Sequence, residues 1–343
     1  KGNLRQGVRA NKILYRGLHV KYPFENGIDV LPKEEIVEIL HSFVENPHKA
    51  APANFREWMF HVFGDGLTTK YMLPYNEKIW KTPPEEMSLE WVDRVPRPPL
   101  LDLIRTAVGI QTEGYTHQLY FDYPDRGGFE SLPRAVAARL AGKVFTGFRV
   151  AKVRPVEGGW AVVSTTGEER RYRQLVATIP ITTLFSVLDE VPAEVNAAAR
   201  ALRFNSLRVA LVGVDVTTLP AYTALYVPDP ASLYHRVCYN HVFSPDNVPA
   251  GCNSVSCEIT VAPGSEQDAW SDQAVLDRVV GDLARDGILD PARIVHRSVH
   301  REKFAYVVYD LGYSARVTTI RDYTQARGIH LAGRFAEYRY VNT

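Results

Sequence analysis

The chain is organised around its last segment, Gly328-Ile-His-Leu-Ala-Gly-Arg-Phe-Ala-Glu-Tyr-Arg-Tyr-Val-Asn-Thr343. The apolar residues Ile329 to Ala332 predict a short buried strand, after which Gly333 allows another molecule to approach the backbone closely. A buried strand that ends in Gly-Arg commonly places the glycine backbone and the arginine side chain against a ligand at the carboxyl edge of a sheet. The same residues also fit a surface turn that carries Tyr and Arg.

Length and composition indicate a globular protein of roughly two domains. The chain has 343 residues, of which 45% are hydrophobic and 23% charged, as is ordinary for such proteins. Its formal net charge of +1 gives no basic field for nucleic acid or for an acidic membrane. Apolar runs stay below the roughly 20 residues of a membrane-spanning helix, and the first residues lack the apolar core of a signal peptide. We therefore expect a cytoplasmic protein without nucleic-acid or membrane partners.

Cysteine and histidine residues do not predict a metal site. Cys238, Cys252 and Cys257 have neither metal-ligand nor CxxC spacing, which favours reduced cysteines in the core. The ten histidines are scattered and form no HExxH motif. The 18 tyrosines and five tryptophans suit a site that stacks rings and binds phosphates, although core packing explains most of them.

The pattern of apolar residues changes near residue 118, from helical to strand periodicity. Residues 1–112 are expected to be mainly helical. One helix begins at Leu31-Pro32-Lys33-Glu34-Glu35, and Asn54 is the expected N-cap of the next, with Glu57 at the capping-box position.

Strand patterns dominate after residue 118. Turns with glycine join three segments into a predicted β-meander, and a buried strand over Leu175–Pro180 follows it. The meander strands are Val144–Val153, Gly158–Ser164 and Arg170–Tyr172, and later strands are Leu207–Val216, Ala224–Val227, Tyr234–Phe243, Ser254–Val261 and Val295–His300. With a last helix at Ser314–Ala326, the fold class is mixed α/β (α+β), in which residues 328–332 re-enter one sheet late.

The side chains do not form a self-contained catalyst. No GxGxxG follows a predicted strand, and there is no Walker loop, GxSxG elbow or Cys–His arrangement. Tyr and Arg residues at strand ends are more informative, because Tyr226 lies ten residues before Arg236, one hairpin arm away. A guanidinium fork with several phenols suits a pyrophosphate. Exposed residues of a sheet explain each of them taken singly.

Five blocks of sequence, together with the Ala177–Pro180 strand, resemble the eukaryotic-type UDP-galactopyranose mutases, within the broader flavin amine-oxidase-like superfamily. They occur in the right order along nearly the whole chain, and they are Tyr22–Glu35, Asn54–Trp58, Met72–Trp80, Met87–Trp91 and Gly333–Tyr340. The resemblance implies a fold of the FAD-linked reductase type, with a split FAD domain, a mixed substrate sheet and a helical subdomain. The implied parts are a helical substrate-side subdomain (1–112), the remaining FAD-domain part with the meander (113–205), the substrate-binding sheet and helix (206–325), and the return strand with the flavin-facing turn (326–343).

The resemblance also implies roles for particular residues. Gly333 and Arg334 fall at the FAD cofactor. The residues that fall at the uridine are Tyr22, Phe24, Asn54 and Trp58, and those at the pyrophosphate are Tyr226, Arg236, Tyr306 and Tyr340. The chemistry in that family belongs to N5 of the reduced flavin, so we expect no catalytic side chain and no metal. The protein supplies orientation and electrostatics to a small-molecule substrate such as a UDP-sugar.

Three departures from the family pattern keep other functions open. Residues 1–343 contain neither the glycine-rich strand–turn–helix that holds the FAD pyrophosphate nor the later flavin-facing helix, so we expect these residues alone to bind FAD poorly and to be inactive. Leu73 stands where the mutases have an Arg on the substrate pyrophosphate, and Glu25 where they have a Gln. Losing such an arginine contact costs about 2–5 kcal/mol.

Two alternatives to the mutase activity follow. An FAD-dependent oxidoreductase of the amine-oxidase or protoporphyrinogen-oxidase type, acting on a non-UDP substrate, agrees with Leu73 and Glu25. A non-catalytic nucleotide-sugar-binding remnant agrees with the missing FAD motif.

Overall fold

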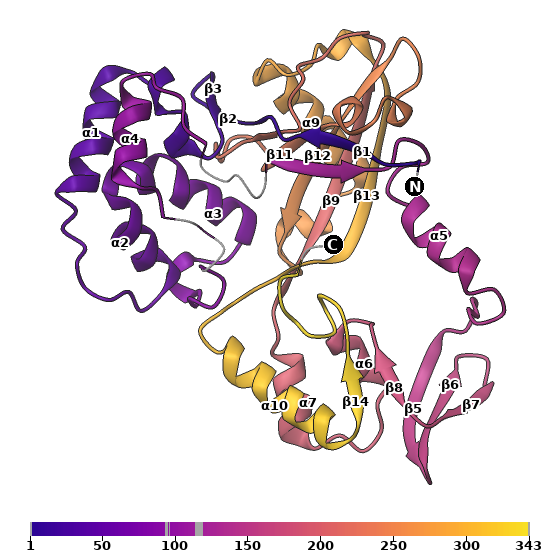
Figure 1. The fold of residues 1–343 in the computed structure, drawn as a ribbon. Coiled ribbons are helices and arrows are strands. Elements are labelled where there is room, and N and C mark those ends of the chain that lie inside the picture. The colour runs from indigo at the N-terminus through magenta and orange to yellow at the C-terminus, as the bar shows by residue number, and fades with distance from the viewer. Residues whose placement is uncertain (1, 93–94, 96, 114–118, 342–343) are drawn as a thin grey trace. The chain divides into compact units, whose positions relative to one another are not determined.

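The computed structural model describes residues 2–92, 95, 97–113 and 119–341, drawn as a ribbon in Figure 1. The chain divides into two compact units. Unit 1 comprises Lys1–Val136 and Ser206–Lys303, and unit 2 comprises Ala137–Asn205 and Phe304–Thr343.

A seven-stranded sheet is the centre of unit 1, with the strand order β13-β9-β12-β11-β10-β2-β3. Its strands are β2 (Asn11–Tyr15), β3 (Leu18–Lys21), β9 (Phe204–Val214), β10 (Ala224–Tyr226), β11 (Arg236–Tyr239), β12 (Asn253–Val261) and β13 (Ile294–Val307). β10 runs parallel to β2. The pairs β9–β12, β12–β11 and β11–β10 are antiparallel. Helix α9 (Asp272–Arg285) buries Val275, Val279 and Leu283 in the same core as the strands, which fixes the sheet.

The segment predicted to be mainly helical begins with strands instead. β1 (Arg5–Val8) pairs with β4 (Tyr120–Tyr123), and the hairpin β2–β3 forms one edge of the large sheet. Arg16 and Gly17 connect β2 to β3, and both have positive φ, 49° and 81°. Two such residues form the tight hairpin turn whose twist matches that of the strands.

Helices α1 (Lys33–Val44), α2 (Phe55–Leu67), α3 (Leu73–Trp80) and α4 (Leu100–Ala107) follow. The predicted N-cap is confirmed, because the Glu57 amide donates to Asn54 Oδ1 at 3.0 Å and the Ala53 amide donates to Glu57 Oε2 at 2.8 Å. Gly64 kinks α2 with a φ of 68°, and a Cβ there would lie 2.3 Å from the Ser42 carbonyl oxygen. Glycine therefore allows α2 to pack closely against α1.

The strand predicted over Tyr234–Phe243 is wrong in its second half. β11 ends at Tyr239, and Asn240–Phe243 form the short helix α8. The Asn240 side chain donates to Ser254 Oγ at 2.9 Å and accepts from Ser256 Oγ at 3.0 Å. These hydrogen bonds to β12 stabilise the chain at Asn240, where it leaves the sheet.

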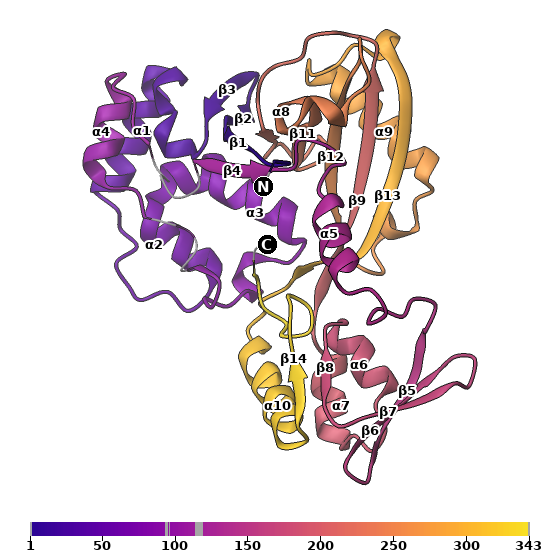
Figure 2. The same cartoon turned by 45° about the vertical axis from the view of Figure 1, so that its right-hand side comes forward.

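Unit 2 contains the predicted β-meander and the late return strand. β5 (Val150–Val156), β6 (Gly159–Ser164) and β7 (Glu169–Tyr172) form a three-stranded antiparallel sheet, whose first strand begins at Val150 and not at Val144. β14 (Ile329–Leu331) pairs in parallel with β8 (Leu175–Ala177), so the late strand re-enters a sheet as predicted (Figure 2). Helices α6 (Ile181–Val187), α7 (Ala193–Arg200) and α10 (Tyr313–Ala326) complete this unit.

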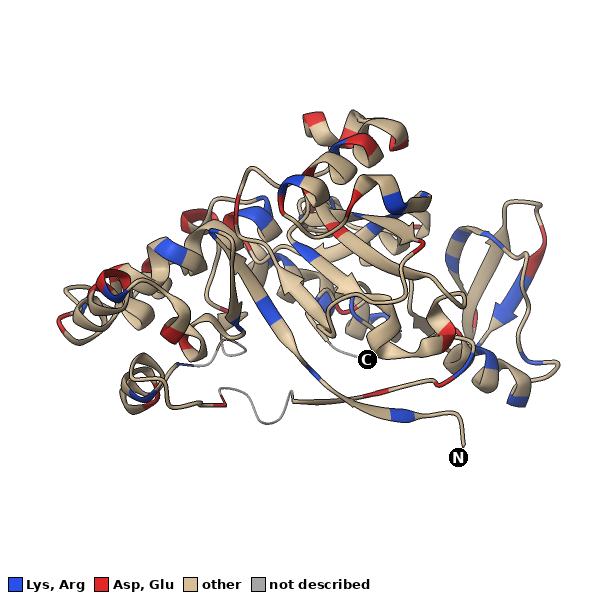
Figure 3. Cartoon of the chain, turned by 90° about the horizontal axis from the view of Figure 1, so that it is seen from above, with Lys and Arg blue, Asp and Glu red and all other residues tan. Residues whose placement is uncertain are grey.

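Charge is spread evenly over the chain. Figure 3 shows basic and acidic residues interspersed along the helices and strands, consistent with the formal net charge of +1. In the described parts of the chain, no helix has the length and apolar character needed to cross a membrane.

Candidate functional site

A row of polar side chains crosses three neighbouring strands of unit 1. Tyr226 on β10 lies opposite Arg236 on β11, as predicted, and Arg236 lies opposite Glu258 on β12. Arg236 Nη2 is 2.6 Å from both carboxylate oxygens of Glu258. Burial raises the pKa of the Tyr226 phenol, and the charge and hydrogen bond of Arg236 oppose that rise. Glu258 therefore orients a guanidinium that also contacts a phenol.

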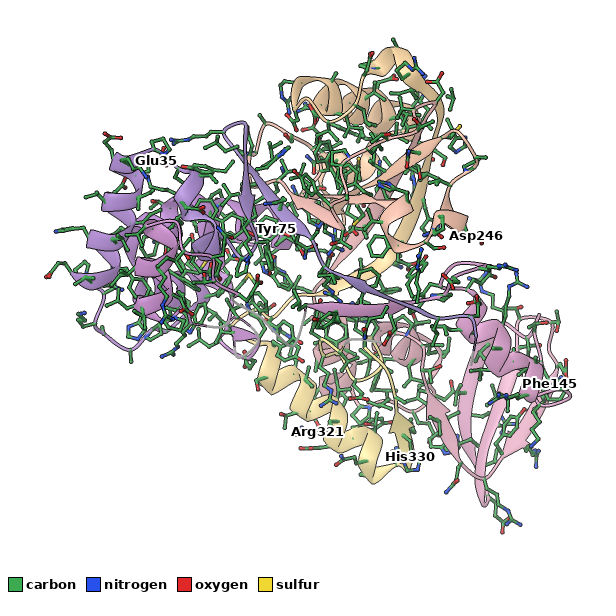
Figure 4. All side chains as sticks on the ribbon, turned by 45° about the horizontal axis from the view of Figure 1, so that its top comes forward. Glu35, Tyr75, Phe145, Asp246, Arg321 and His330 are labelled. Carbon is green, nitrogen blue, oxygen red and sulfur yellow. The ribbon has the colours of Figure 1, made fainter. Side chains whose placement is uncertain are left out.

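Four tyrosines gather beside this row, and we call Tyr22, Tyr71, Tyr75 and Tyr226 the tyrosine cluster. Tyr22 stacks on Tyr226 with ring centroids 4.7 Å apart, and Tyr75 meets Tyr226 edge-on at 5.6 Å. Tyr71 stacks on Tyr75 at 5.4 Å and on Phe24 at 5.1 Å. The rings come from the residue after β3, the π-helical segment Thr68–Met72 before α3, α3 itself and β10, and Figure 4 labels Tyr75 among them. Tyr22, Tyr75 and Tyr226 remain half-buried, so they present ring surface to a ligand.

Glu25 is a buried carboxyl group at this cluster. It lies in the 3-10 turn Phe24–Asn26, and only 8% of its surface is exposed. Burial raises its pKa to about 7, although a hydrogen bond from its own backbone amide lowers it. The charge of Glu25 in turn helps to raise the pKa of Tyr71, after burial and the other three tyrosines of the cluster. No cation contributes to the pKa shift of Glu25 within the described part of the chain.

The residues predicted to hold uridine fall into two groups. Tyr22 and Phe24 belong to the tyrosine cluster or contact it, whereas Asn54 caps α2 through Glu57. Trp58 is 3% exposed, and its ring packs against those of Phe55 and Phe63 at 5.9 and 5.7 Å. The contacts of Asn54 and Trp58 are those of a helix cap and a core residue, and their ligand-binding role stays a prediction.

The other predicted residues meet in unit 2. The Arg334 guanidinium lies 4.0 Å from the ring centroid of Tyr340 and 5.8 Å from that of Tyr306. The backbone turns sharply at Gly333, where φ is 101° and the space of a Cβ is open. The Glu337 amide donates to the Gly333 carbonyl at 2.9 Å, which fixes this turn. Thus Tyr306 and Tyr340 surround Arg334, while Tyr226 and Arg236 belong to unit 1.

Arg334 fits a flavin. Its Nε and Nη2 atoms are buried and have no hydrogen-bond partner among the described residues. A buried unsatisfied donor costs about 1–3 kcal/mol, so the site favours a ligand with acceptor atoms, as the carbonyl oxygens of a flavin are. A cavity of about 490 Å³ lies next to this turn, lined by residues of α10, β14 and the segment that follows, including Arg321 and His330 in Figure 4.

Sequence reasoning missed three residues of this arrangement. Tyr71 and Tyr75 have the i,i+4 spacing that places two rings on one face of a helix, and this spacing was the available signal. Glu258 alternates with the apolar Cys257 and Ile259 on a predicted strand, so the face on which it lies was predictable. Its pairing with Arg236 depends on strand register.

Comparison with known proteins identifies the family of the chain. Residues 73–341 match the model of the family described as flavin containing amine oxidoreductase. A crystal structure of reduced UDP-galactopyranose mutase has 25% identity and a TM-score of 0.90, and the match covers 99% of this chain and 76% of that one. The "Putative protoporphyrinogen oxidase" from Exiguobacterium sp. 255-15 has 17% identity and a TM-score of 0.72, with 97% and 77% covered. Cyclohexylamine oxidase from Brevibacterium oxydans IH-35A has 12% identity and a TM-score of 0.62, with 98% and 77% covered.

The last two matches show the fold alone, whereas the family match extends over most of the chain. The protein is therefore a member of the flavin containing amine oxidoreductase family, which uses FAD, and it resembles UDP-galactopyranose mutase in fold.

Proposed function

We propose that this protein is an FAD-dependent enzyme that isomerises the sugar ring of a nucleotide sugar. The observation that carries the proposal is the pairing of Tyr226 with Arg236 beside the tyrosine cluster. This part of unit 1 offers the Arg236 guanidinium together with the hydroxyl groups and ring faces of the tyrosines. A nucleotide sugar has matching groups, namely a pyrophosphate and a planar base. The similarity to UDP-galactopyranose mutase supports the same reaction class.

The residues of the chain would divide the work between cofactor and substrate. Arg334 Nε and Nη2 would donate to the flavin, and the Gly333 backbone would lie against it. When bound, FAD in its reduced form supplies the nucleophilic nitrogen for the anomeric carbon. We assign residues 113–205 and 326–343 to the FAD domain, and the sheet within residues 206–325 to the substrate.

The substrate side stabilises the departing phosphate. Arg236 would bind the pyrophosphate that carries negative charge when the sugar is released, with Tyr226 as a neutral donor. Glu258 holds the Arg236 side chain in place, so that less rotamer entropy is lost on binding. Tyr306 and Tyr340 flank Arg334 in unit 2, and their predicted role as phosphate donors stays a prediction.

A second function is favoured by Glu25 and Leu73. Glu25 is a buried carboxyl group, and Leu73 is an apolar side chain where the mutases have an arginine. The substrate side therefore carries less positive charge than it would with that arginine. An FAD-dependent oxidoreductase that acts on a substrate without phosphate would have no use for Arg236 as an anion ligand.

Binding of nucleoside diphosphates separates these functions. The FAD-loaded, chemically reduced protein is titrated with UDP and GDP, and flavin fluorescence is recorded for the wild type and for Arg236→Ala. We expect binding by the wild type and a loss of roughly 30- to 5000-fold in Arg236→Ala, which corresponds to about 2–5 kcal/mol. Arg293→Ala is the matched control, because Arg293 pairs with Asp215 near the edge strand β13, which β9 and β12 separate from β11. Absence of binding to any nucleoside diphosphate would reject the proposed function and favour the oxidoreductase.

A further inference from the structure

We propose that a cavity of unit 1, separate from the tyrosine cluster, binds the phosphate group of a small phosphate ester. The cavity has a volume of about 290 Å³, and its lining comes from α3 and the residue after it, from the segment that joins β10 to β11, and from α9 with the residues before it. Among the described residues that line it there is neither Arg236 nor a member of the tyrosine cluster. It is therefore a site in addition to the one that the proposed function uses.

Two lysines give this cavity positive charge. Lys78 is 8% exposed, and its Nζ donates to the backbone carbonyls of Val227 and Asp229 at 2.9 and 2.6 Å, which leaves one N–H of the ammonium for a ligand. Lys81 is half-buried, and within the described chain its ammonium makes neither a hydrogen bond nor an ion pair. Glu77 is the one acid of the lining, and its side chain is exposed. The charge of the two lysines is thus available to an anion.

A third cation lines the cavity but is already paired. Arg278 Nε lies 2.9 Å from a carboxylate oxygen of Asp282, and its Nη2 donates to the Ala231 carbonyl at 2.5 Å. These bonds hold the guanidinium in one orientation. It can add a hydrogen bond to an anion through Nη1, while the lysines supply the uncompensated charge.

The backbone of Lys81 is an independent indication of a binding site. Lys81 follows the last residue of α3 with a φ of 49°, in the left-handed region that glycine and asparagine favour at this position. A cation at a helix C-terminus interacts favourably with the helix dipole, but an exposed side chain would do so equally well. A lysine that combines this backbone with partial burial is a local conflict of the kind that proteins retain at binding sites.

Burial disfavours the charge of both lysines, and an anion would offset this cost. Burial lowers the pKa of Lys78 to about 7, against the opposing charges of Asp229, Asp286 and Asp282, and Lys81 lowers that pKa further. Burial also lowers the pKa of Lys81. A phosphate ester carries nearly two negative charges at neutral pH and several acceptor oxygens, so it matches two ammonium groups.

The rest of the lining determines what carries the phosphate. The volume of the cavity lies near the lower end of small-molecule sites, about 300 Å³, and exceeds what a single phosphate group fills. Apolar residues contribute to the lining, namely Trp270, Pro74, Pro230 and Leu233. A phosphate ester with a small apolar group would cover these residues, whereas inorganic phosphate would leave them wet.

Calorimetric titration of the FAD-loaded protein tests this site. Phenyl phosphate and inorganic phosphate are titrated into Arg236→Ala, which removes the proposed phosphate ligand of the other site. The same titrations are made with double variants that add either Lys81→Asn or the control Lys33→Met, whose exposed lysine begins α1. Asparagine suits the left-handed backbone of position 81, so Lys81→Asn should fold at least as stably as its parent, which thermal unfolding verifies.

We expect Arg236→Ala to bind phenyl phosphate, and to bind it more tightly than inorganic phosphate. Lys81→Asn should weaken this binding by about 10- to 100-fold, the value of a charge-assisted hydrogen bond, and Lys33→Met should leave it unchanged. Absence of binding to Arg236→Ala, or equal binding after Lys81→Asn, would overturn the proposed site without affecting the function proposed above. Equal affinities for the two phosphates would overturn the ester and identify inorganic phosphate as the ligand.

Discussion

Arg236 and Glu258 face each other on adjacent strands, with Arg236 Nη2 2.6 Å from both oxygens of the carboxylate. The side chain of Glu258 is 14% exposed and that of Arg236 is 32% exposed. The proposed phosphate ligand is thus already neutralised by a partly buried acid. A bound pyrophosphate would share the guanidinium with Glu258, so the pair sets how strongly Arg236 attracts an anion.

Removing the charge of Glu258 should make Arg236 a stronger phosphate ligand. Glu258→Gln keeps an acceptor for the guanidinium but leaves its positive charge without a counter-ion. We expect the free energy of unfolding to fall by about 1–3 kcal/mol without ligand, and the thermal shift on adding a nucleoside diphosphate to exceed that of the wild type. Thermal unfolding with and without GDP or UDP measures both effects. Glu266→Gln, an exposed acid, serves as control, and a smaller ligand shift in Glu258→Gln would contradict the prediction.

Parts of this architecture were predictable because the signals are local. Asn54 and Glu57 lie within one helical turn, so the cap was readable from their spacing. Tyr226 and Arg236 lie on one hairpin, and β14 is a short apolar run followed by glycine. In each case few residues, close in sequence, determine the structure.

Other features depend on contacts between distant residues. The β2–β3 hairpin turns on Arg16-Gly17, and Arg is not a residue that signals a left-handed turn. β11 ends where Asn240 contacts Ser254 and Ser256, and these bonds exist only once β12 has paired with β11. Likewise, Glu258 neutralises Arg236 only in one strand register, which a single sequence does not specify.

Arg334 should be required for FAD binding more than for folding. Arg334→Met removes two buried donors that have no partner in the described protein while keeping an apolar side chain against Tyr340. We expect the affinity for FAD to fall by about 10- to 100-fold, the value of one or two charge-assisted hydrogen bonds. Dialysis against dilute FAD, followed by the absorbance of the retained flavin, measures the change.

Arg339→Met provides the comparison for this experiment, since the Arg339 side chain is 64% exposed and pairs with Glu337 at 2.8 Å. Its FAD content should equal that of the wild type. If both variants retain FAD equally, Arg334 is not a cofactor ligand.

Asp282 should stabilise the segment that leads into β11. Its buried carboxylate accepts the Leu233 amide at 2.7 Å, Arg285 Nη1 at 2.6 Å and Arg278 Nε at 2.9 Å. Asp282→Asn replaces a charged acceptor by a neutral amide, so we expect the free energy of unfolding to fall by about 2–3 kcal/mol in urea. Asp277→Asn, on the exposed face of the same helix, should change it by less than about 0.5 kcal/mol. Equal effects of the two substitutions would disprove the role of Asp282.

The raised pKa of Glu25 should make stability depend on pH. Its pKa rises from 4.5 to about 7 through burial, so between these values the folded state retains a proton that the unfolded state releases. Stability must therefore decrease as pH rises from 4.5 to about 7 and level off above it, a loss of about 3 kcal/mol at 1.36 kcal/mol per pKa unit. The phenols that face Glu25 stay neutral over this range, because burial raises the pKa of Tyr71 further above its ordinary value.

Glu25→Gln isolates this contribution, because a glutamine has the same shape and does not titrate. Urea unfolding at pH 5 and at pH 8 should give similar stabilities for the wild type and Glu25→Gln at the lower pH. At the higher pH the variant should be the more stable protein by about 3 kcal/mol. An identical pH dependence in the two proteins would show that Glu25 is already ionised in the folded state at pH 5 and would contradict the prediction.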